Sequence, residues 1–206
     1  MTWQDFAPAS TSRKRESTEW SITYSYDSLN ETLPRVLLIG DSICNGYNGA
    51  VRGMLGGKAN VSFWASSKCV TDPDYFRELD FMLDARPYAA VSFNNGLHSL
   101  TTNRGEWDAA YASAVSFIRA KLPQAKLALT LSTPLMDPAL TAVSASLNET
   151  VLRLAEEQKL PVIDLFSAMD PLDRGEFWTD TYHFKPAAIE MQAKVISDTL
   201  CGLLGL

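Results

Sequence analysis

From residue 35 onward, short apolar runs alternate with longer amphipathic segments. The apolar runs are rich in β-branched and aliphatic side chains, which is typical of buried strands; they cover residues 35–39, 60–64, 89–94, 126–131 and 161–165. The amphipathic segments have helical periodicity and lie near residues 46–56, 73–85, 107–121, 139–159 and 186–204. Strands separated by helices predict right-handed crossovers and a parallel sheet covered on both faces. We therefore expect an α/β fold, a three-layer α/β/α sandwich with a five-stranded parallel sheet.

Residues 1–33 have a different pattern and are expected to form an N-terminal extension to a domain that spans 34–206. Ser, Thr and charged residues dominate 1–17, so this first part is predicted to be mobile. In 18–33 the residues Trp20, Ile22, Tyr24 and Tyr26 alternate with polar ones, as in a half-buried strand. This second part is expected to pack on the domain.

Length and charge limit the classes of partner. The chain has 206 residues, which fits one domain, and a formal net charge of −6. An acidic chain is a poor match for nucleic acid or an anionic membrane, because Lys and Arg supply most of the binding to both. No apolar run approaches the length of a membrane span. The pattern does not determine the oligomeric state.

The N-terminus lacks the features of a secretory leader. A basic cluster at 13–15 is not followed by an apolar core. The chain as given is expected to be cytoplasmic, and removal of a leader would instead imply a secreted or periplasmic protein. The chain contains three cysteines and two histidines with no metal-ligand spacing, so no metal site and no organic cofactor are expected.

Two short motifs carry residues that could perform nucleophilic catalysis. The sequence Gly40-Asp41-Ser42-Ile43 follows a buried strand, and Asp180-Thr181-Tyr182-His183 precedes the last predicted helix. Together they supply a serine nucleophile, a histidine base and an aspartate that orients the imidazole. Each motif also has a simpler interpretation, in which Asp41 or Ser42 caps a helix and His183 is a surface residue that caps the last helix.

This pair of motifs resembles the SGNH (GDSL-type) hydrolase family, and the resemblance covers residues 34–200. It implies a flavodoxin-like strand order, 2-1-3-4-5, and ester hydrolysis by Ser42, His183 and Asp180. In such a sheet the loops after the first three strands meet at the carboxyl ends, where ligands bind. These loops contain Ser42, a stretch beginning at Ala65, and the segment 94–98.

The resemblance also implies an oxyanion hole. The family's third motif is Gly-x-Asn-Asp, and here Gly96-Leu97-His98-Ser99 places His98 at the asparagine position. An imidazole N–H can donate as an amide does, so His98 is the expected donor, and Asn94 or Asn95 is the alternative. The backbone N–H of Ser42 and that of Ala65 or Ser66 would complete the hole, although the family's glycine is missing from this second motif.

Aromatic residues next to Asp180 suggest a substrate pocket. Trp178 and Tyr182 flank this aspartate and are expected to line the pocket. The sequence thus predicts a carboxylic ester hydrolase that cleaves short acyl esters, with acetyl groups on carbohydrate or another small alcohol as candidates. Two alternatives remain: a sugar-binding domain that has lost turnover, and an unrelated flavodoxin-like or nucleotide-binding protein whose two motifs are only helix caps. The last lacks a glycine-rich phosphate loop.

Overall fold

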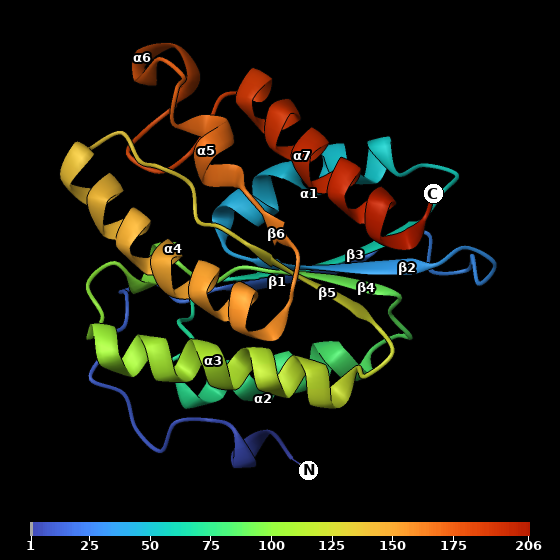
Figure 1. Cartoon of the computed structure of the whole chain (residues 1–206), viewed down its shortest axis with the longest axis horizontal. Coiled ribbons are helices and arrows are strands. Elements are labelled where there is room, and N and C mark those ends of the chain that lie inside the picture. The colour runs from blue at the N-terminus through green and yellow to red at the C-terminus, as the bar shows by residue number, and fades with distance from the viewer. Residues whose placement is uncertain (1) are drawn as a thin grey trace.

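A six-stranded sheet with helices on both faces forms the protein (Figure 1). The computed structural model describes residues 2–206, so Met1 of the predicted extension lies outside the described residues. In chain order the elements are the 3₁₀ turn η1 (Trp3–Asp5), β1 (Ser21–Ser25), β2 (Arg35–Gly40), α1 (Ser42–Met54), β3 (Asn60–Ser66), α2 (Pro73–Asp84), β4 (Ala90–Phe93), the 3₁₀ turn η2 (Leu97–Ser99), α3 (Arg104–Lys121), β5 (Lys126–Thr130), α4 (Pro138–Gln158), β6 (Val162–Ile163), α5 (Leu165–Met169), α6 (Arg174–Phe177) and α7 (Pro186–Leu204).

The strand order is β1-β3-β2-β4-β5-β6. Strands β3, β2, β4, β5 and β6 are parallel and follow the predicted flavodoxin-like order. The predicted strand count was too low, because β1 pairs antiparallel with β3, with Ser21 opposite Ser66 and Ser25 opposite Ser62. The second part of the extension thus adds an edge strand, as its alternating pattern suggested.

Two hydrophobic layers enclose the sheet. One side of the sheet packs against α2, α3 and α4, and the other packs against α1, α5 and α7. Figure 1 shows α1 and α7 on one side and α2 and α3 on the other, with the N-terminal turn η1 beyond α2 and α3. Strand β2 lies in the middle of the sheet and all its residues are buried, which matches the unbroken apolar run in its sequence.

Local sequence signals explain where the helices begin and end. Asp137 caps α4 and is followed by Pro138, while Pro186 opens α7 in the position where its missing N–H costs nothing. Helix α1 begins at Ser42, before the predicted start, because Asp41 accepts a hydrogen bond from the Ile43 N–H at 2.9 Å. The predicted strand 161–165 is shortened to β6, since Asp164 caps the short helix α5.

The first part of the extension packs on the domain through a buried arginine and two aromatic side chains. Arg13 is only 8% exposed and pairs with the buried Asp72 at 2.5 Å. Trp3 and Phe6 lie against the cluster under α2 and α3. These contacts do not measure motion, so the mobility expected for residues 1–17 stays a prediction. Among residues 2–206, none of the helices combines the length and apolar character that a membrane crossing requires.

Candidate active site

Ser42 is the first residue of α1, directly beyond the carboxyl end of β2. Gly40 permits this tight strand-to-helix turn, since a Cβ there would lie 2.7 Å from Cys44 Cβ. The helix cap is Asp41, so the Ser42 hydroxyl is not needed for capping. Cys44 is no competing nucleophile, because burial raises the pKa of its thiol far above the ordinary value.

Asp180 and His183 lie in the loop between α6 and α7. A bridge between Trp178 and Phe184, with a hydrogen bond from the Thr179 N–H to the His183 carbonyl at 2.9 Å, closes this loop into a tight turn. Asp180 Oδ1 accepts from the backbone N–H of His183 at 2.9 Å, and the carboxylate oxygens lie 2.9 and 3.0 Å from His183 Nδ1. The local turn therefore holds the imidazole against the carboxylate.

The other imidazole nitrogen reaches the serine. His183 Nε2 is 2.8 Å from Ser42 Oγ. With the proton on Nδ1 donated to Asp180, Nε2 is an acceptor for the Ser42 hydroxyl proton. The structure thus brings the three predicted residues into one continuous chain of hydrogen bonds, which is the arrangement that activates a serine for attack on a carbonyl.

The Asp180 carboxylate is strongly favoured in its ionised form. Partial burial would raise the pKa of this group, but hydrogen bonds from the Tyr182 and His183 N–H groups and from the His183 ring outweigh it and lower the pKa from 3.8 to about 2. A carboxylate that stays ionised can orient the imidazole and stabilise the positive charge it acquires on taking a proton.

Ser42 and His183 open into a cavity of about 540 Å³. Its wall combines apolar side chains with a few polar ones, and consists of Glu16, Trp20, Ser42, Leu97, His98, Leu100, Thr101, Leu140, Tyr182 and His183. Two of these, Glu16 and Trp20, come from the N-terminal extension. The cavity can accept a small ester, with the serine and histidine at one part of its wall and leucines at another.

His98 lies on the wall of this cavity, as its position in the motif suggested. Its Nδ1 is 2.5 Å from a Glu16 carboxylate oxygen, and its Nε2 is buried with no hydrogen-bond partner among residues 2–206. The alternative donors are already engaged. Asn94 donates to the Thr130 carbonyl and to Ser132 Oγ, and Asn95 donates to the Lys68 carbonyl. Neither asparagine belongs to the cavity wall.

The structure does not bring Ala65 and Ser66 to the cavity. Both are fully buried within β3, where Ala65 is opposite Gly40 of β2 and Ser66 is opposite Ser21 of β1. Pairing with β2 at Ala65 and with β1 at both residues extends β3 past the predicted strand end at residue 64, so these residues continue the sheet and form no loop. The predicted role of Ala65 or Ser66 as a backbone donor in the oxyanion hole is therefore not supported, because neither residue lines the cavity that contains Ser42.

Trp178 also requires correction. It is 2% exposed and packs against Phe184, with ring centroids 4.4 Å apart, so it belongs to the core under the loop and not to the cavity wall. Tyr182, on the other side of Asp180, is 40% exposed and does line the cavity, as expected.

Sequence reasoning missed the contribution of the extension. The alternation of apolar and polar residues in 18–33 predicted that Trp20 would pack on the domain. It did not indicate that the Trp20 ring would line the cavity that contains Ser42. Glu16 had no signal, because it lies in the polar stretch predicted to be mobile. The apolar wall residues Leu97, Leu100 and Leu140 follow strands or open helices and were indistinguishable from ordinary core residues.

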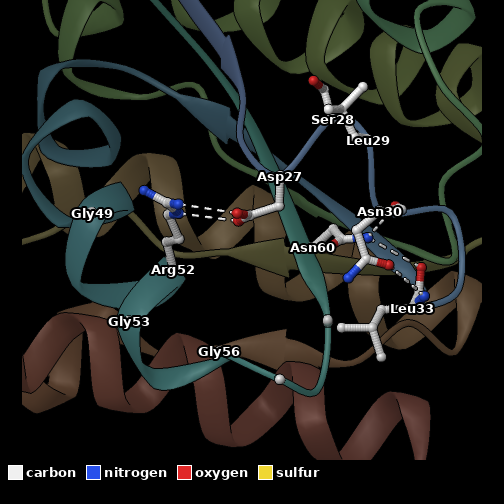
Figure 2. A pocket seen from close by; sticks show the side chains of 12 residues that line it. Asp27, Ser28, Leu29, Asn30, Leu33, Gly49, Arg52, Gly53, Gly56 and Asn60 are labelled. Atoms are coloured by element: carbon white, nitrogen blue, oxygen red, sulfur yellow. Dashed lines mark hydrogen bonds and ion pairs between the residues drawn. The ribbon is translucent and has the colours of Figure 1, made fainter.

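A larger cavity lies elsewhere, at the opposite ends of the strands (Figure 2). It measures about 850 Å³ and lies between the β1–β2 connection and the end of α1. Figure 2 shows the Asp27 carboxylate facing the Arg52 guanidinium, with two hydrogen bonds of 3.1 Å. The Asp27 carboxylate is paired with Arg52, and no histidine or cysteine is among the residues that line this cavity, so its size does not mark it as the site of chemistry. Nowhere in residues 2–206 are three or more His, Cys, Asp or Glu side chains grouped to hold a metal ion.

Comparisons with known proteins agree with this fold. No protein-family model matches the chain, and no curated protein matches it in sequence. Solved structures do match. An acetylxylan esterase from Geobacillus stearothermophilus has 18% sequence identity and a TM-score of 0.66, over 84% of this chain and 94% of the esterase.

Two further structures give the same result. A candidate acylhydrolase from Bacteroides fragilis has 17% identity and a TM-score of 0.68, over 85% of this chain and 90% of its own. A candidate GDSL-like lipase from Parabacteroides merdae has 14% identity and a TM-score of 0.66, over 82% of this chain and 96% of the lipase. The resemblance to GDSL-type hydrolases is thus confirmed at the level of the fold.

Proposed function

We propose that this protein is a serine ester hydrolase of the GDSL type. The observation that carries the proposal is the hydrogen-bonded chain from Asp180 through His183 to Ser42, with contacts of 2.9 and 2.8 Å. A serine as a helix cap or a histidine as a surface residue would not require this alignment. The fold shared with acetylxylan esterases and a candidate GDSL-like lipase supports the same conclusion.

The reaction begins with attack of Ser42 Oγ on the ester carbonyl. His183 Nε2 takes the serine proton and then returns it to the leaving alcohol, while Asp180 holds the imidazolium through Nδ1. The acyl-enzyme is then hydrolysed by a water molecule that His183 activates in the same way. Backbone N–H of Ser42 and the ring of His98 are the proposed oxyanion donors, because the Asn94 and Asn95 amides are already bonded elsewhere.

Short acyl esters, including acetyl groups on carbohydrate, are the proposed substrates. The neighbours named as acetylxylan esterases support this class. Trp20 and Tyr182 provide aromatic surface on the cavity wall, on which a sugar ring or another small alcohol could pack. The second-motif residues Ala65 and Ser66 lie away from the cavity, and this observation favours one competing function, a sugar-binding domain without turnover.

The test is hydrolysis of p-nitrophenyl acetate, butyrate and octanoate and of acetylated xylo-oligosaccharide by the purified protein, with fluorophosphonate labelling followed by peptide mapping. We expect hydrolysis that is fastest for the acetyl ester, and a label on Ser42. Ser42→Ala should lose at least about a thousandfold in activity. Ser116→Ala is the matched control, since this exposed serine on α3 bonds only to the Ala112 carbonyl. Sugar binding without hydrolysis or labelling would instead support the binding domain.

A further inference from the structure

The cavity contains a second histidine–carboxylate pair besides His183 and Asp180. His98 Nδ1 lies 2.5 Å from Glu16 Oε1, although 82 residues separate them in the chain. The His98 side chain is 16% exposed and that of Glu16 is 44% exposed, so the contact lies at the edge of the cavity. Trp20 packs edge-on against the His98 ring, with centroids 5.8 Å apart.

The two pairs differ at the second ring nitrogen. His183 Nε2 bonds to Ser42, whereas His98 Nε2 is buried and has no partner within the described part of the chain. A buried polar nitrogen without a partner costs free energy, and such groups are rare unless they serve a function. The residue lines the same cavity as Ser42, so a turn of the ring would bring Nε2 to the reacting ester, and the transition state is a candidate partner.

Buried contacts fix the segment that carries Glu16. The Arg13 guanidinium donates to the carbonyls of His98, at 3.3 Å, and Ser67, at 2.9 Å, and pairs with Asp72. The Glu16 N–H donates to Glu19 Oε1 at 2.9 Å. Glu16 is therefore presented to His98 by a segment that is anchored to the loops after β3 and β4.

We propose that Glu16 is a positioning residue for His98. This inference rests on the proposed serine mechanism and on His98 as its oxyanion donor. With the Nδ1 proton held by Glu16, the ring carries an N–H on Nε2 only when it is positively charged, and the carboxylate, which also faces Arg13 Nη2 at 3.7 Å, balances this charge. A cationic donor is a stronger partner for a developing oxyanion than a neutral one. Since His98 Nε2 is covered by protein atoms, this role requires the ring to turn toward the oxyanion when substrate binds.

A competing interpretation is that Glu16 only anchors the extension. The isosteric substitution Glu16→Gln separates the two, because an amide oxygen still accepts from Nδ1 but supplies no negative charge. We expect kcat to fall about tenfold with KM changed less than about twofold, since a charge-assisted hydrogen bond would be replaced by a neutral one. The thermal midpoint should not change. Glu31→Gln, at an exposed position of the same extension, is the matched control and should keep full activity.

A double-mutant cycle gives the decisive result. Glu16→Gln should have no further effect on kcat in a His98→Ala background, because its action passes through the ring. An equal loss in both backgrounds would overturn the proposal, as would full activity of the single variant. If Ser42→Ala abolishes activity and His98→Ala does not affect it, the serine mechanism stands and this proposal fails. If Ser42→Ala remains active, the proposed function itself fails.

A readout independent of activity is the NMR signal of the His98 ring. The chain has two histidines, so the variants His98→Ala and His183→Ala assign both rings. In the wild type we expect a downfield Nδ1 proton on His98 from its bond to Glu16, and Glu16→Gln should shift this signal upfield. An unchanged His98 signal would contradict the pairing whatever the kinetics show.

Discussion

His183 Nε2 lies 2.8 Å from Ser42 Oγ, although 141 residues separate the two along the chain. The parallel sheet makes this meeting possible. Ser42 follows the central strand β2, and α7, which packs against α1 on the same face, begins just after His183. The pair therefore joins the first and last parts of the sandwich at the carboxyl ends of the strands.

The first prediction follows from this contact. Ser42→Ala and His183→Ala should each lower kcat/KM by at least about a thousandfold, and the double variant should be little worse than either, because the two groups act as one unit. Asp180→Asn should be milder, since His183 would keep its contact with Ser42. The measurement is the rate of ester hydrolysis by the wild type, the three single variants and the double variant. Losses that multiply in the double variant would mean that the two residues act independently.

The second prediction concerns pH. The Asp180 carboxyl should titrate at about 2 in the folded protein, below its ordinary pKa of 3.8. Because the folded pKa is the lower one, this group stabilises the fold above about pH 4, and the contribution is lost as pH falls through about 2. Carboxyl carbon shifts followed by NMR measure it directly. His183→Ala should raise the pKa by removing the ring hydrogen bond, and no change in this variant would contradict the assigned cause.

The third prediction concerns Gly96. A Cβ at this position would lie 1.7 Å from Ser132 Oγ and 2.8 Å from Ser132 Cβ. The loop after β4 therefore packs so tightly against the segment after β5 that there is no room for a side chain at Gly96. Gly96→Ala should lower the free energy of unfolding by about 1–3 kcal/mol or more. Urea unfolding measures it. Gly202→Ala in α7, where a Cβ meets nothing within 4 Å, should instead stabilise by about 0.4–1 kcal/mol. Ser132→Gly should rescue part of the loss, and equal effects of the two alanine variants would refute the steric cause.

The fourth prediction concerns the anchor of the extension. Burial raises the pKa of Asp72, and Arg13 is the cation that pairs with it. Arg13→Ala should lower the free energy of unfolding by about 3–5 kcal/mol, because it leaves a buried carboxylate without its partner. Amide exchange in residues 2–20 should also accelerate. Adding Asp72→Asn should restore part of the stability, whereas the exposed Lys14→Ala should stay within about 0.5 kcal/mol of wild type. Slow exchange in the Arg13 variant would show that other contacts hold the extension.

Much of the fold could be predicted because its signals are local. The apolar runs that became β2 to β6 needed only short-range patterns, and the helix predicted from residue 186 begins there, at Pro186. The motifs containing Ser42 and His183 were recognisable through their resemblance to the GDSL-type family, and in the structure each forms a local turn with its own cap or hydrogen bond. The Asp180 carboxylate accepts from the N–H groups of Tyr182 and His183, which is a property of four consecutive residues.

Other features depended on which distant segments meet. The pairing of β3 with β1 and β2 placed Ala65 and Ser66 inside the sheet, and a tryptophan expected in the cavity, Trp178, is buried against Phe184. The sequence by itself determined the order of helices and parallel strands and the residues able to form a relay, because periodicity, caps and turns are set by neighbours in the chain. Only the tertiary structure decided that Glu16 meets His98 and that Asn94 is already bonded, since these contacts depend on the packing of segments tens of residues apart.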